Sequence, residues 1–323
     1  MDTPVLYPMQ LSPVCRSTIW GGNRMRDCFD FQSKLDNIAE AWMLSAREDN
    51  PGFIVGCEYM GECLHKLLEK YPSMIAKNNE DPACPLLIKF IDARDKLSIQ
   101  VHPDDAYAKA AGCADPRGKT EMWIVLEASM GAELIFGTNR NFTEDELRAA
   151  IEGGTLEELM NYVPVRAGDV FFIPAGLIHA IGGGILLAEV QQNCDTTYRV
   201  YDYNRRQADG SLRALHVDDA VKCAKHFTEE EISALQYENG DRDCLVDSKY
   251  FHVETVTARA ETALCVGDDS FVSLLVTAGS GVLVHNSGEY ALTPGASYFL
   301  PAGMGEYSVR GTGGSVTVIL SKI

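Results

Sequence analysis

One short motif constrains the fold of this chain more than any other stretch. It runs from Gly168 to His179 and consists of a glycine, five residues, Pro174, one residue, Gly176, two residues and the histidine. The residues before Pro174 form a mostly apolar run, Val-Phe-Phe-Ile, which favours a strand, and the flanking glycines and proline favour turns. The motif therefore predicts a strand that enters a tight turn and ends on His179.

The motif resembles the second sequence motif of the cupin superfamily, whose members are small double-sheet β-barrels and whose motif histidine is a metal ligand. The same spacing recurs at Gly295, Pro301 and Gly303, with Glu306 in place of the histidine. A repeat at this domain-scale distance indicates a second barrel of the same kind. His285 is the only candidate partner for Glu306 just upstream, and a lone histidine is more often a surface residue. The second copy is therefore expected to keep the turn and to have lost the metal.

The motif and its repeat predict a mainly β fold with two cupin-type jelly-roll β-barrels and a helical insertion. Residues 1–240 are expected to form a catalytic cupin domain with helical insertions. Residues 241–323 are expected to form a C-terminal degenerate cupin-like β domain. The acidic, polar stretch at 238–243 is the expected boundary.

Helix signals interrupt the β pattern in the first domain. Thr143 and Glu146 have the spacing of a capping box, in which each residue satisfies a backbone N–H of the other. Further helices are predicted at 155–161, 216–226 and 228–236. The helix that starts at Thr143 and the one at 155–161 would form the insertion between barrel strands.

Charge and cysteine usage limit the possible partners and compartment. The net charge of −18 argues against nucleic-acid and membrane-surface binding, and an anionic substrate would need local lysines and arginines. No apolar run approaches the length of a membrane helix, and the N-terminus has no secretory signal pattern. The 10 cysteines are scattered without a Cys-x-x-Cys pair, which is typical of reduced thiols. The sequence therefore predicts a cytoplasmic protein without nucleic-acid or membrane partners.

Several polar residues stand within otherwise apolar strands. Lys89 lies in the apolar stretch 85–93, either as a strand-edge charge or facing a pocket. Gln100 and His102 share one face of the strand at 97–102, and the sequence allows that face to point to solvent or into a barrel cavity. Glu121 begins an apolar strand, where it forms either a surface pair with nearby Lys119 or part of a site.

Four of the candidate side chains are suited to one metal ion. An amide oxygen from Gln100, a carboxylate from Glu121 and imidazoles from His102 and His179 form a donor set that suits Zn²⁺ and also accepts Fe²⁺, Mn²⁺ or Co²⁺. No thiolate takes part, and positions remain open for water or substrate. Such a site would be catalytic in type.

Several motifs together resemble the type I mannose-6-phosphate isomerases, and the chain length resembles their short bacterial subgroup. Residues 97–103 read Leu-Ser-Ile-Gln-Val-His-Pro, which is the family signature. Residues 119–122 read Lys-Thr-Glu-Met where the family more often has Lys-Pro-Glu. Residues 193–199 read Asn-Cys-Asp-Thr-Thr-Tyr-Arg, similar to the family's Asn-Ser-Asp-x-x-x-Arg, whose arginine lies in the active site. The resemblance runs from about residue 12 to the C-terminus.

That resemblance implies a zinc-dependent aldose–ketose isomerase that interconverts mannose 6-phosphate and fructose 6-phosphate through a cis-enediol(ate). It implies one Zn²⁺ per chain, a sugar phosphate substrate, and a monomer or homodimer. Arg199 would stabilise the enediolate or assist ring opening. Lys119, whose pKa burial and a nearby metal would lower, and a zinc-bound water are both candidates for proton transfer. Lys89, Lys119 and Arg199 are the cations available for the phosphate.

Two other functions are compatible with parts of this pattern. A metal-dependent cupin dioxygenase would resemble proteins with a His-x-His pair and a nearby glutamate, whereas this chain has Gln-x-His and a distant glutamate. A non-catalytic sugar-binding cupin would be expected to lack a metal ligand or Arg199, and all of these residues are present. The isomerase is therefore the predicted function.

Overall fold

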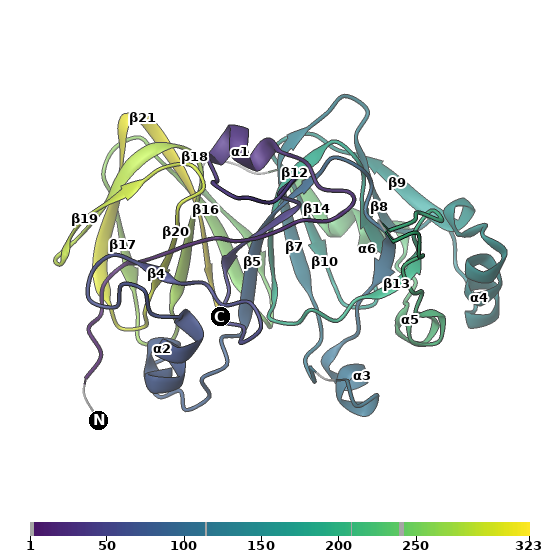
Figure 1. Cartoon of the computed structure of the whole chain (residues 1–323), viewed down its shortest axis with the longest axis horizontal. Coiled ribbons are helices and arrows are strands. Elements are labelled where there is room, and N and C mark those ends of the chain that lie inside the picture. The colour runs from purple at the N-terminus through teal and green to yellow at the C-terminus, as the bar shows by residue number, and fades with distance from the viewer. Residues whose placement is uncertain (1–2, 114, 208, 239–241) are drawn as a thin grey trace. The chain divides into compact units, whose positions relative to one another are not determined.

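The computed structural model describes residues 3–113, 115–207, 209–238 and 242–323. Strands far outnumber helices among these residues, and most neighbouring strands run antiparallel (Figure 1). The predicted mainly β fold is confirmed. The central part of the expected boundary, residues 239–241, lies outside the described residues.

The chain forms two compact units. The first comprises Met1–Arg16, Asn23–Phe90 and Asn239–Ile323, and the second comprises Ser17–Gly22 and Ile91–Glu238. The N-terminal segments group with the C-terminal strands because β1 (Met9–Leu11) pairs with β20 (Ser297–Leu300). These units are defined by which residues pack together. The division into a catalytic and a C-terminal domain at residue 240 stays a prediction.

The first unit is built on a large antiparallel sheet. Its strand order is β15-β16-β21-β18-β20-β1-β4, with β17 on β21 and β19 on β18. An apolar core cluster that includes Leu274, Tyr298 and Val318 packs against it. The strands not yet given are β4 (Ile54–Val55), β15 (Arg242–Asp247), β16 (His252–Ala258), β17 (Thr262–Val266), β18 (Val272–His285), β19 (Gly288–Leu292) and β21 (Gly305–Lys322).

The first unit also contains a short strand pair and small helices. β2 (Val14–Arg16) pairs with β3 (Glu40–Leu44). The helices are α1 (Arg24–Phe29), α2 (Leu64–Lys70) and the 3₁₀ turn η1 (Pro72–Met74). The buried strand β5 (Leu86–Ala93) continues from this unit into the second.

The second unit contains two groups of antiparallel strands, which hold the candidate site. In one group β10 (Asp169–Ile173) pairs with β14 (Gln236–Glu238) and β7 (Glu121–Ala128), and β7 pairs with β12 (Ile185–Gln192). The other group has the order β13-β6-β11-β8-β9. Its strands are β6 (Ile99–Val101), β8 (Glu133–Thr138), β9 (Met160–Pro164), β11 (His179–Ile181) and β13 (Tyr198–Tyr201).

The helices of the second unit cover the outer face of the five-stranded sheet. Figure 1 shows α4 (Glu144–Gly153) and α5 (Val217–Cys223) on the side of β9 and β13. Ile99 and Val101 of β6 share one apolar cluster with Leu147 of α4 and Val221 of α5. Because these apolar residues face the helices, the alternate residues Gln100 and His102 face away from them. The structure thus decides between the two orientations that the sequence had left open.

The predicted capping box is confirmed at the start of α4. The Glu146 carboxylate accepts from the Thr143 backbone N–H at 2.7 Å, and the Thr143 hydroxyl accepts from the Glu146 N–H at 3.2 Å. The helices expected at 216–226 and 228–236 are α5 and α6 (Glu229–Ala234). The helix expected at 155–161 is wrong in extent: η2 (Leu156–Leu159) is a 3₁₀ turn, and Met160 already belongs to β9. Pairing of β9 with β8 takes precedence over the local helix signal there.

The Pro-x-Gly turn of the first motif has the conformation that only glycine adopts without strain. Gly176 has a φ of +93°, and its N–H donates to the His102 carbonyl at 3.0 Å. A Cβ on Gly176 would meet the Lys225 side chain at 2.8 Å and the Cys223 carbonyl oxygen at 3.0 Å. The turn therefore ties the end of β10 to the strand that carries His102.

The second motif keeps this turn within a different environment. Gly303 again has a positive φ, +74°, but Glu306 is exposed. His285 is only 7% exposed and its Nε2 lies 3.4 Å from the Met304 carbonyl oxygen, so it is a buried histidine and not a surface one. Among the described residues, neither His285 nor Glu306 belongs to a cluster of potential metal ligands.

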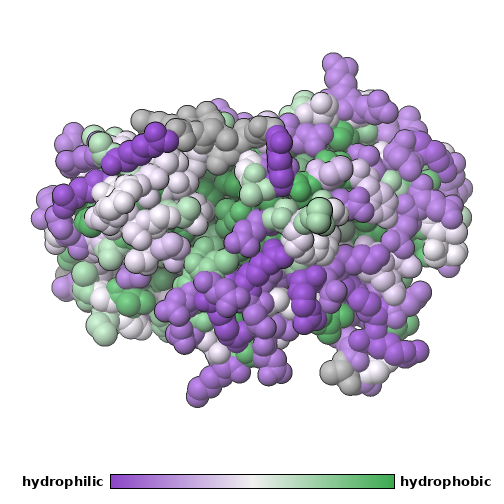
Figure 2. Space-filling view, turned by 90° about the horizontal axis from the view of Figure 1, so that it is seen from above, coloured by the Kyte–Doolittle hydropathy of each residue, from purple (hydrophilic) through white to green (hydrophobic). Residues whose placement is uncertain are grey.

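The molecular surface carries both hydrophilic and hydrophobic side chains. Hydrophilic side chains cover much of the face seen in Figure 2, with smaller hydrophobic areas between them. Within the described ranges, none of the helices combines the length and the apolar character needed to cross a bilayer.

The two glycines of the first motif give a matched test of this turn. Gly168 also has a positive φ, +97°, but a Cβ there would meet nothing within 4 Å. Gly168→Ala should cost about 1 kcal/mol of unfolding free energy through backbone strain alone. Gly176→Ala should cost roughly 3 kcal/mol because a clash with a backbone carbonyl is added. Urea unfolding of both variants measures the difference, and equal losses would contradict the proposed role of the turn.

Candidate metal centre

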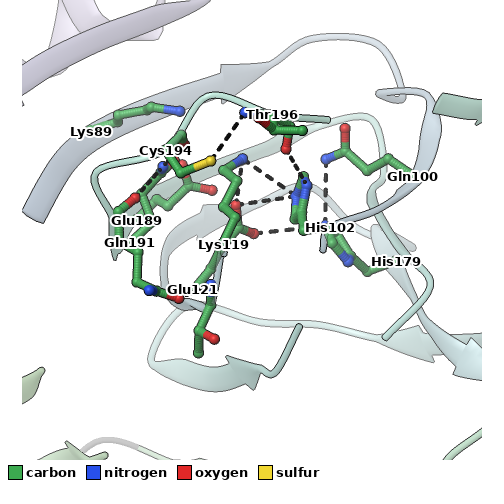
Figure 3. Close-up of polar contacts among 12 residues, drawn as sticks. Lys89, Gln100, His102, Lys119, Glu121, His179, Glu189, Gln191, Cys194 and Thr196 are labelled. Carbon is green, nitrogen blue, oxygen red and sulfur yellow. Dashed lines mark hydrogen bonds and ion pairs between the residues drawn. The ribbon is translucent and has the colours of Figure 1, made fainter. Parts of the chain in front are cut away.

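Strand register brings the predicted ligands together from both strand groups of the second unit. In one group Gln100 of β6 is paired with His179 of β11 on one side and with Arg199 of β13 on the other. His102 follows directly after β6, and Glu121 begins β7 in the other group. Figure 3 shows the side chains of Gln100, His102, Glu121 and His179 pointing toward one another.

The two histidines and the glutamate form a tight, buried cluster. Their ligand atoms all lie within 4.8 Å of one another. His102 Nε2 is 3.3 Å from one Glu121 carboxylate oxygen, and His179 Nε2 is 3.7 Å from the other. Nitrogen and oxygen ligands about 2.0–2.2 Å from a tetrahedral Zn²⁺ lie roughly 3.3–3.6 Å apart. The two histidine–carboxylate distances are close to this range, and the cluster as a whole, with separations up to 4.8 Å, is somewhat wider.

Backbone carbonyls fix the orientation of both imidazoles. His102 Nδ1 lies 3.0 Å from the Thr196 carbonyl oxygen, and His179 Nδ1 lies 2.8 Å from that of Leu177. An Nδ1–H that donates to a carbonyl leaves the Nε2 lone pair free for a metal. Burial lowers the pKa of His102 to about 3 and also lowers the pKa of His179, so both rings are neutral near pH 7. Neutral imidazole is the form that binds metals.

Glu121 supplies a buried negative charge to the cluster. The residue is 1% exposed, and among the described residues neither carboxylate oxygen makes a hydrogen bond of regular geometry. Burial alone would raise the pKa of Glu121, but the Lys119 and His102 side chains outweigh it and hold the pKa well below its usual value. A buried anionic carboxylate between two neutral imidazoles fits a divalent cation.

Gln100 lies at the edge of this cluster. Its amide nitrogen is 3.5 Å from His179 Nε2, and the side chain is partly buried. Rotation of the terminal amide by 180° would place its oxygen at the same point. Gln100 is therefore within reach of a metal held by the other three residues.

Lys119 belongs to the cluster as a cation. Its Nζ lies 2.7 Å from a Glu121 carboxylate oxygen and 3.3 Å from His102 Nε2, and the residue is buried. Burial alone would lower the pKa of Lys119, but the carboxylates of Glu121 and Glu189 outweigh it and raise the pKa above its usual value. The protein's own groups therefore act against the lowered pKa expected from the sequence.

The sequence reasoning missed a carboxylate that supports the site. The Glu189 carboxylate accepts a hydrogen bond of 2.8 Å from Trp123 Nε1, and the Trp123 ring meets the His179 ring edge-on with centroids 5.4 Å apart. Glu189 and Trp123 face each other across β12 and β7. The available signal was a glutamate in the otherwise apolar run Ile-Leu-Leu-Ala-Glu-Val, since such a charge is rarely buried without a partner.

Arg199 lies beside the cluster and close to two further arginines. It donates to the Ser98 hydroxyl at 3.2 Å and to the Ala214 carbonyl at 3.1 Å. Burial and the positive charge of Arg213 lower the pKa of Arg199. Arg205 and Arg213 both pair with Asp202. The sequence reasoning missed these two arginines, because their positions in a loop carry no periodic signal.

Lys89 lies on the part of β5 that belongs to the first unit. It is buried, and its Nζ is 3.8 Å from the Glu40 carboxylate and 5.4 Å from the centroid of the Trp42 ring. A cation over a tryptophan face is favourable and offsets part of the cost of burying the charge. Its predicted contact with substrate remains a prediction.

A mainly β chain with a buried His–Glu–His cluster between its strands fits the class of metal-binding cupin proteins. Two family models match the chain: "Phosphomannose isomerase type I, catalytic domain" over residues 9–151 and "Mannose-6-phosphate isomerase, cupin domain" over residues 242–320. This chain belongs to the type I phosphomannose isomerase family and is an isomerase.

Individual relatives agree along nearly the whole chain. The chain is 34% identical to mannose-6-phosphate isomerase ManA of Bacillus subtilis (strain 168) over 94% of its length and 96% of the relative's. It is 34% identical to a mannose-6-phosphate isomerase of Streptococcus mutans over 91% and 92% of the two lengths. The crystal structure of the mannose 6-phosphate isomerase from Bacillus subtilis superposes with a TM-score of 0.88 at 33% identity, covering 98% of this chain and 99% of that one.

The geometry predicts that a divalent cation stabilises the folded chain. At a free ZnCl₂ concentration 100 times the dissociation constant, binding should add about 2.7 kcal/mol to the free energy of unfolding. His179→Ala should abolish this gain because it removes a ligand. His252→Ala should retain it, since His252 lies in the first unit beside Asp247. Unfolding of metal-stripped protein with and without ZnCl₂ measures the gain, and an equal gain in both variants would contradict the site.

Proposed function

We propose that this chain is a zinc-dependent aldose–ketose isomerase that interconverts mannose 6-phosphate and fructose 6-phosphate through a cis-enediol(ate). The main observation behind the proposal is the buried, anionic Glu121 between two neutral imidazoles. Arg199 lies on the neighbouring strand β13, where it is paired with Gln100. Relatives named as mannose-6-phosphate isomerases match nearly the full chain and support this choice of substrate.

The proposed metal ligands are Gln100, His102, Glu121 and His179, which hold one zinc ion. Zinc is favoured because two imidazoles, a carboxylate and an amide oxygen match its preference for nitrogen and oxygen ligands, although Fe²⁺, Mn²⁺ and Co²⁺ accept the same set. When bound, the ion supplies Lewis-acid stabilisation of negative charge on substrate oxygens.

The protein's own groups stabilise the negative charge that the isomerisation creates. A proton must move between C2 and C1 while negative charge develops on a substrate oxygen. Lys119 keeps its proton at Nζ, because neighbouring carboxylates raise its pKa, and we assign it the donor of a charge-assisted hydrogen bond to that oxygen. Arg199 is partly exposed on the strand beside Gln100, and we assign it the stabilisation of the enediolate or assistance to ring opening.

The phosphate requires local positive charge in a protein of net charge −18. Arg199, Arg205 and Arg213 gather around a single carboxylate, Asp202, and so leave a local surplus of cations. We propose that the phosphate binds at this arginine cluster, with the Ser98 hydroxyl beside it. Lys89 stays a further proposed contact with the substrate.

The proposal also covers the cellular compartment and the oligomeric state of the protein. We infer a reducing, cytoplasmic compartment from the scattered cysteines and the lack of a Cys-x-x-Cys pair in the sequence. A monomer or homodimer stays the expected assembly.

A coupled assay tests the proposed reaction. Purified protein should form fructose 6-phosphate from mannose 6-phosphate, lose this activity on chelation and regain it when zinc is returned. Return of Fe²⁺, Mn²⁺ and Co²⁺ in separate samples identifies the metal that supports turnover. Full activity in demonstrably metal-free protein would overturn the metal assignment. No turnover by folded, metal-loaded protein would favour a non-catalytic sugar-binding cupin.

A substitution at Arg199 tests its assignment separately. Arg199→Met should lower kcat/KM for mannose 6-phosphate by at least about 100-fold, because a positioned charge is lost from the developing anion. Arg206→Met provides a matched control, since Arg206 is exposed in the same segment and donates to the Gly210 carbonyl. Steady-state kinetics give kcat/KM for both variants, and similar values of kcat/KM would contradict the assignment of Arg199.

A further inference from the structure

Two consecutive residues after β13 adopt a backbone conformation that is unusual for them. Tyr203 has a φ of +55° and Asn204 a φ of +54°, in the left-handed region. Asparagine tolerates this region, but a bulky tyrosine there is a rare and strained arrangement. Strain of this kind persists only where the surroundings over-determine it, and it gathers at functional sites. The need to connect two elements does not by itself explain the strained backbone conformation of Tyr203.

The ring of Tyr203 contacts two cations. Lys96 Nζ lies 3.5 Å from the ring centroid, and the Arg205 guanidinium carbon lies 5.2 Å from it. The Tyr201 ring meets the same ring edge-on at 5.0 Å. Lys96 is itself held by an ion pair with Glu157 at 3.2 Å. A neutral aromatic face stabilises cations without cancelling their charge, in contrast to a carboxylate.

The left-handed turn also fixes the guanidinium of Arg205 from several sides. Arg205 donates to the Asp202 carbonyl at 3.3 Å, pairs with the Asp202 carboxylate and donates to the Lys96 carbonyl. Because Tyr203 and Asn204 both turn left-handed, the chain doubles back within two residues, and Arg205 returns to the carboxylate that precedes the turn. The guanidinium thus joins Arg213 at Asp202, next to Arg199.

We propose that Tyr203 is a positioning residue for the substrate's phosphate. Its strained turn and its ring hold Arg205 in place within the arginine cluster, and the aromatic contact leaves the positive charge of Arg205 available to a phosphate dianion. This inference rests on the proposed function, because it assumes that the arginine cluster receives the phosphate. It assigns to Tyr203 a role in affinity for the phosphate and none in proton transfer.

Binding and kinetic measurements on ring variants test the role. The probes are inorganic phosphate, as a competitive inhibitor, and mannose 6-phosphate. Tyr203→Leu removes the ring but keeps apolar bulk, and it should raise both the inhibition constant for phosphate and KM by about fivefold or more, with a smaller change in kcat. Tyr203→Phe keeps the ring and should stay within about twofold of the unsubstituted enzyme.

Two controls separate this role from a structural one. Tyr250→Leu removes another tyrosine whose ring faces a lysine, Lys249 at 5.0 Å, in the first unit, and it should leave phosphate inhibition unchanged. A double-mutant cycle with Arg205→Met tests the route of the effect. If Tyr203 acts through Arg205, Tyr203→Leu should add less than twofold in the Arg205→Met background.

The outcomes distinguish failure of the inference from failure of the proposed function. If Arg205→Met leaves phosphate inhibition unchanged, the phosphate does not bind at the arginine cluster and the inference fails with that assignment. If Arg205→Met weakens phosphate binding while Tyr203→Leu does not, the arginine cluster is still the phosphate site, but the proposed role of Tyr203 is overturned. Equal effects of Tyr203→Leu in both backgrounds would show a general structural role and would also overturn it.

Discussion

The candidate site depends on one buried carboxylate. Glu121 is 1% exposed at the start of β7, and its negative charge must be compensated by groups from the facing strands. Lys119 contributes one positive charge, and the two neutral imidazoles of His102 and His179 contribute none. Lys119 balances the charge of Glu121 within the protein, and the Nε2 atoms of both histidines face the same carboxylate, as the ligands of a divalent cation would. The same charge keeps Lys119 protonated, so the metal site and the proposed hydrogen-bond donor have one electrostatic origin.

Comparison of the two sequence motifs shows how one turn can serve two purposes. Both have glycines with positive φ at equivalent points, at Gly176 and Gly303. After the first turn, His179 points into a polar cluster. After the second turn, Glu306 is exposed and the neighbouring core consists of apolar side chains. The turn is a property of local backbone chemistry, whereas a metal site needs ligands from several strands at once.

Features that depend only on neighbouring residues were predictable from the sequence of this chain. The capping box at Thr143, the strand before Pro174 and the candidate metal ligands His102, Glu121 and His179 all follow from residue type, spacing or family resemblance. Features that depend on long-range pairing were not predictable. The direction in which β6 faces is set by the helices α4 and α5 on its apolar side. The pairing of β1 with β20 likewise places N-terminal residues in the same unit as the C-terminal strands.

Electrostatic features were the hardest to foresee, because they depend on which charges meet in space. Lys119 was expected to have a lowered pKa, but Glu121 and Glu189 raise it. Arg205 and Arg213 gave no signal until the fold placed both at Asp202. Glu189 is hidden in the apolar strand β12, whereas Asp202 is close to Arg205 in sequence and meets it only through the left-handed turn at Tyr203 and Asn204.

The most direct test of the central claim is X-ray diffraction at the zinc absorption edge on crystals of zinc-loaded, active protein. The account predicts an anomalous peak about 2.0–2.2 Å from Nε2 of His102, Nε2 of His179 and a Glu121 carboxylate oxygen. A vacant cluster in crystals of fully active protein, or a peak held only by other residues, would contradict the claim that Glu121 and its neighbours form the metal centre of this isomerase.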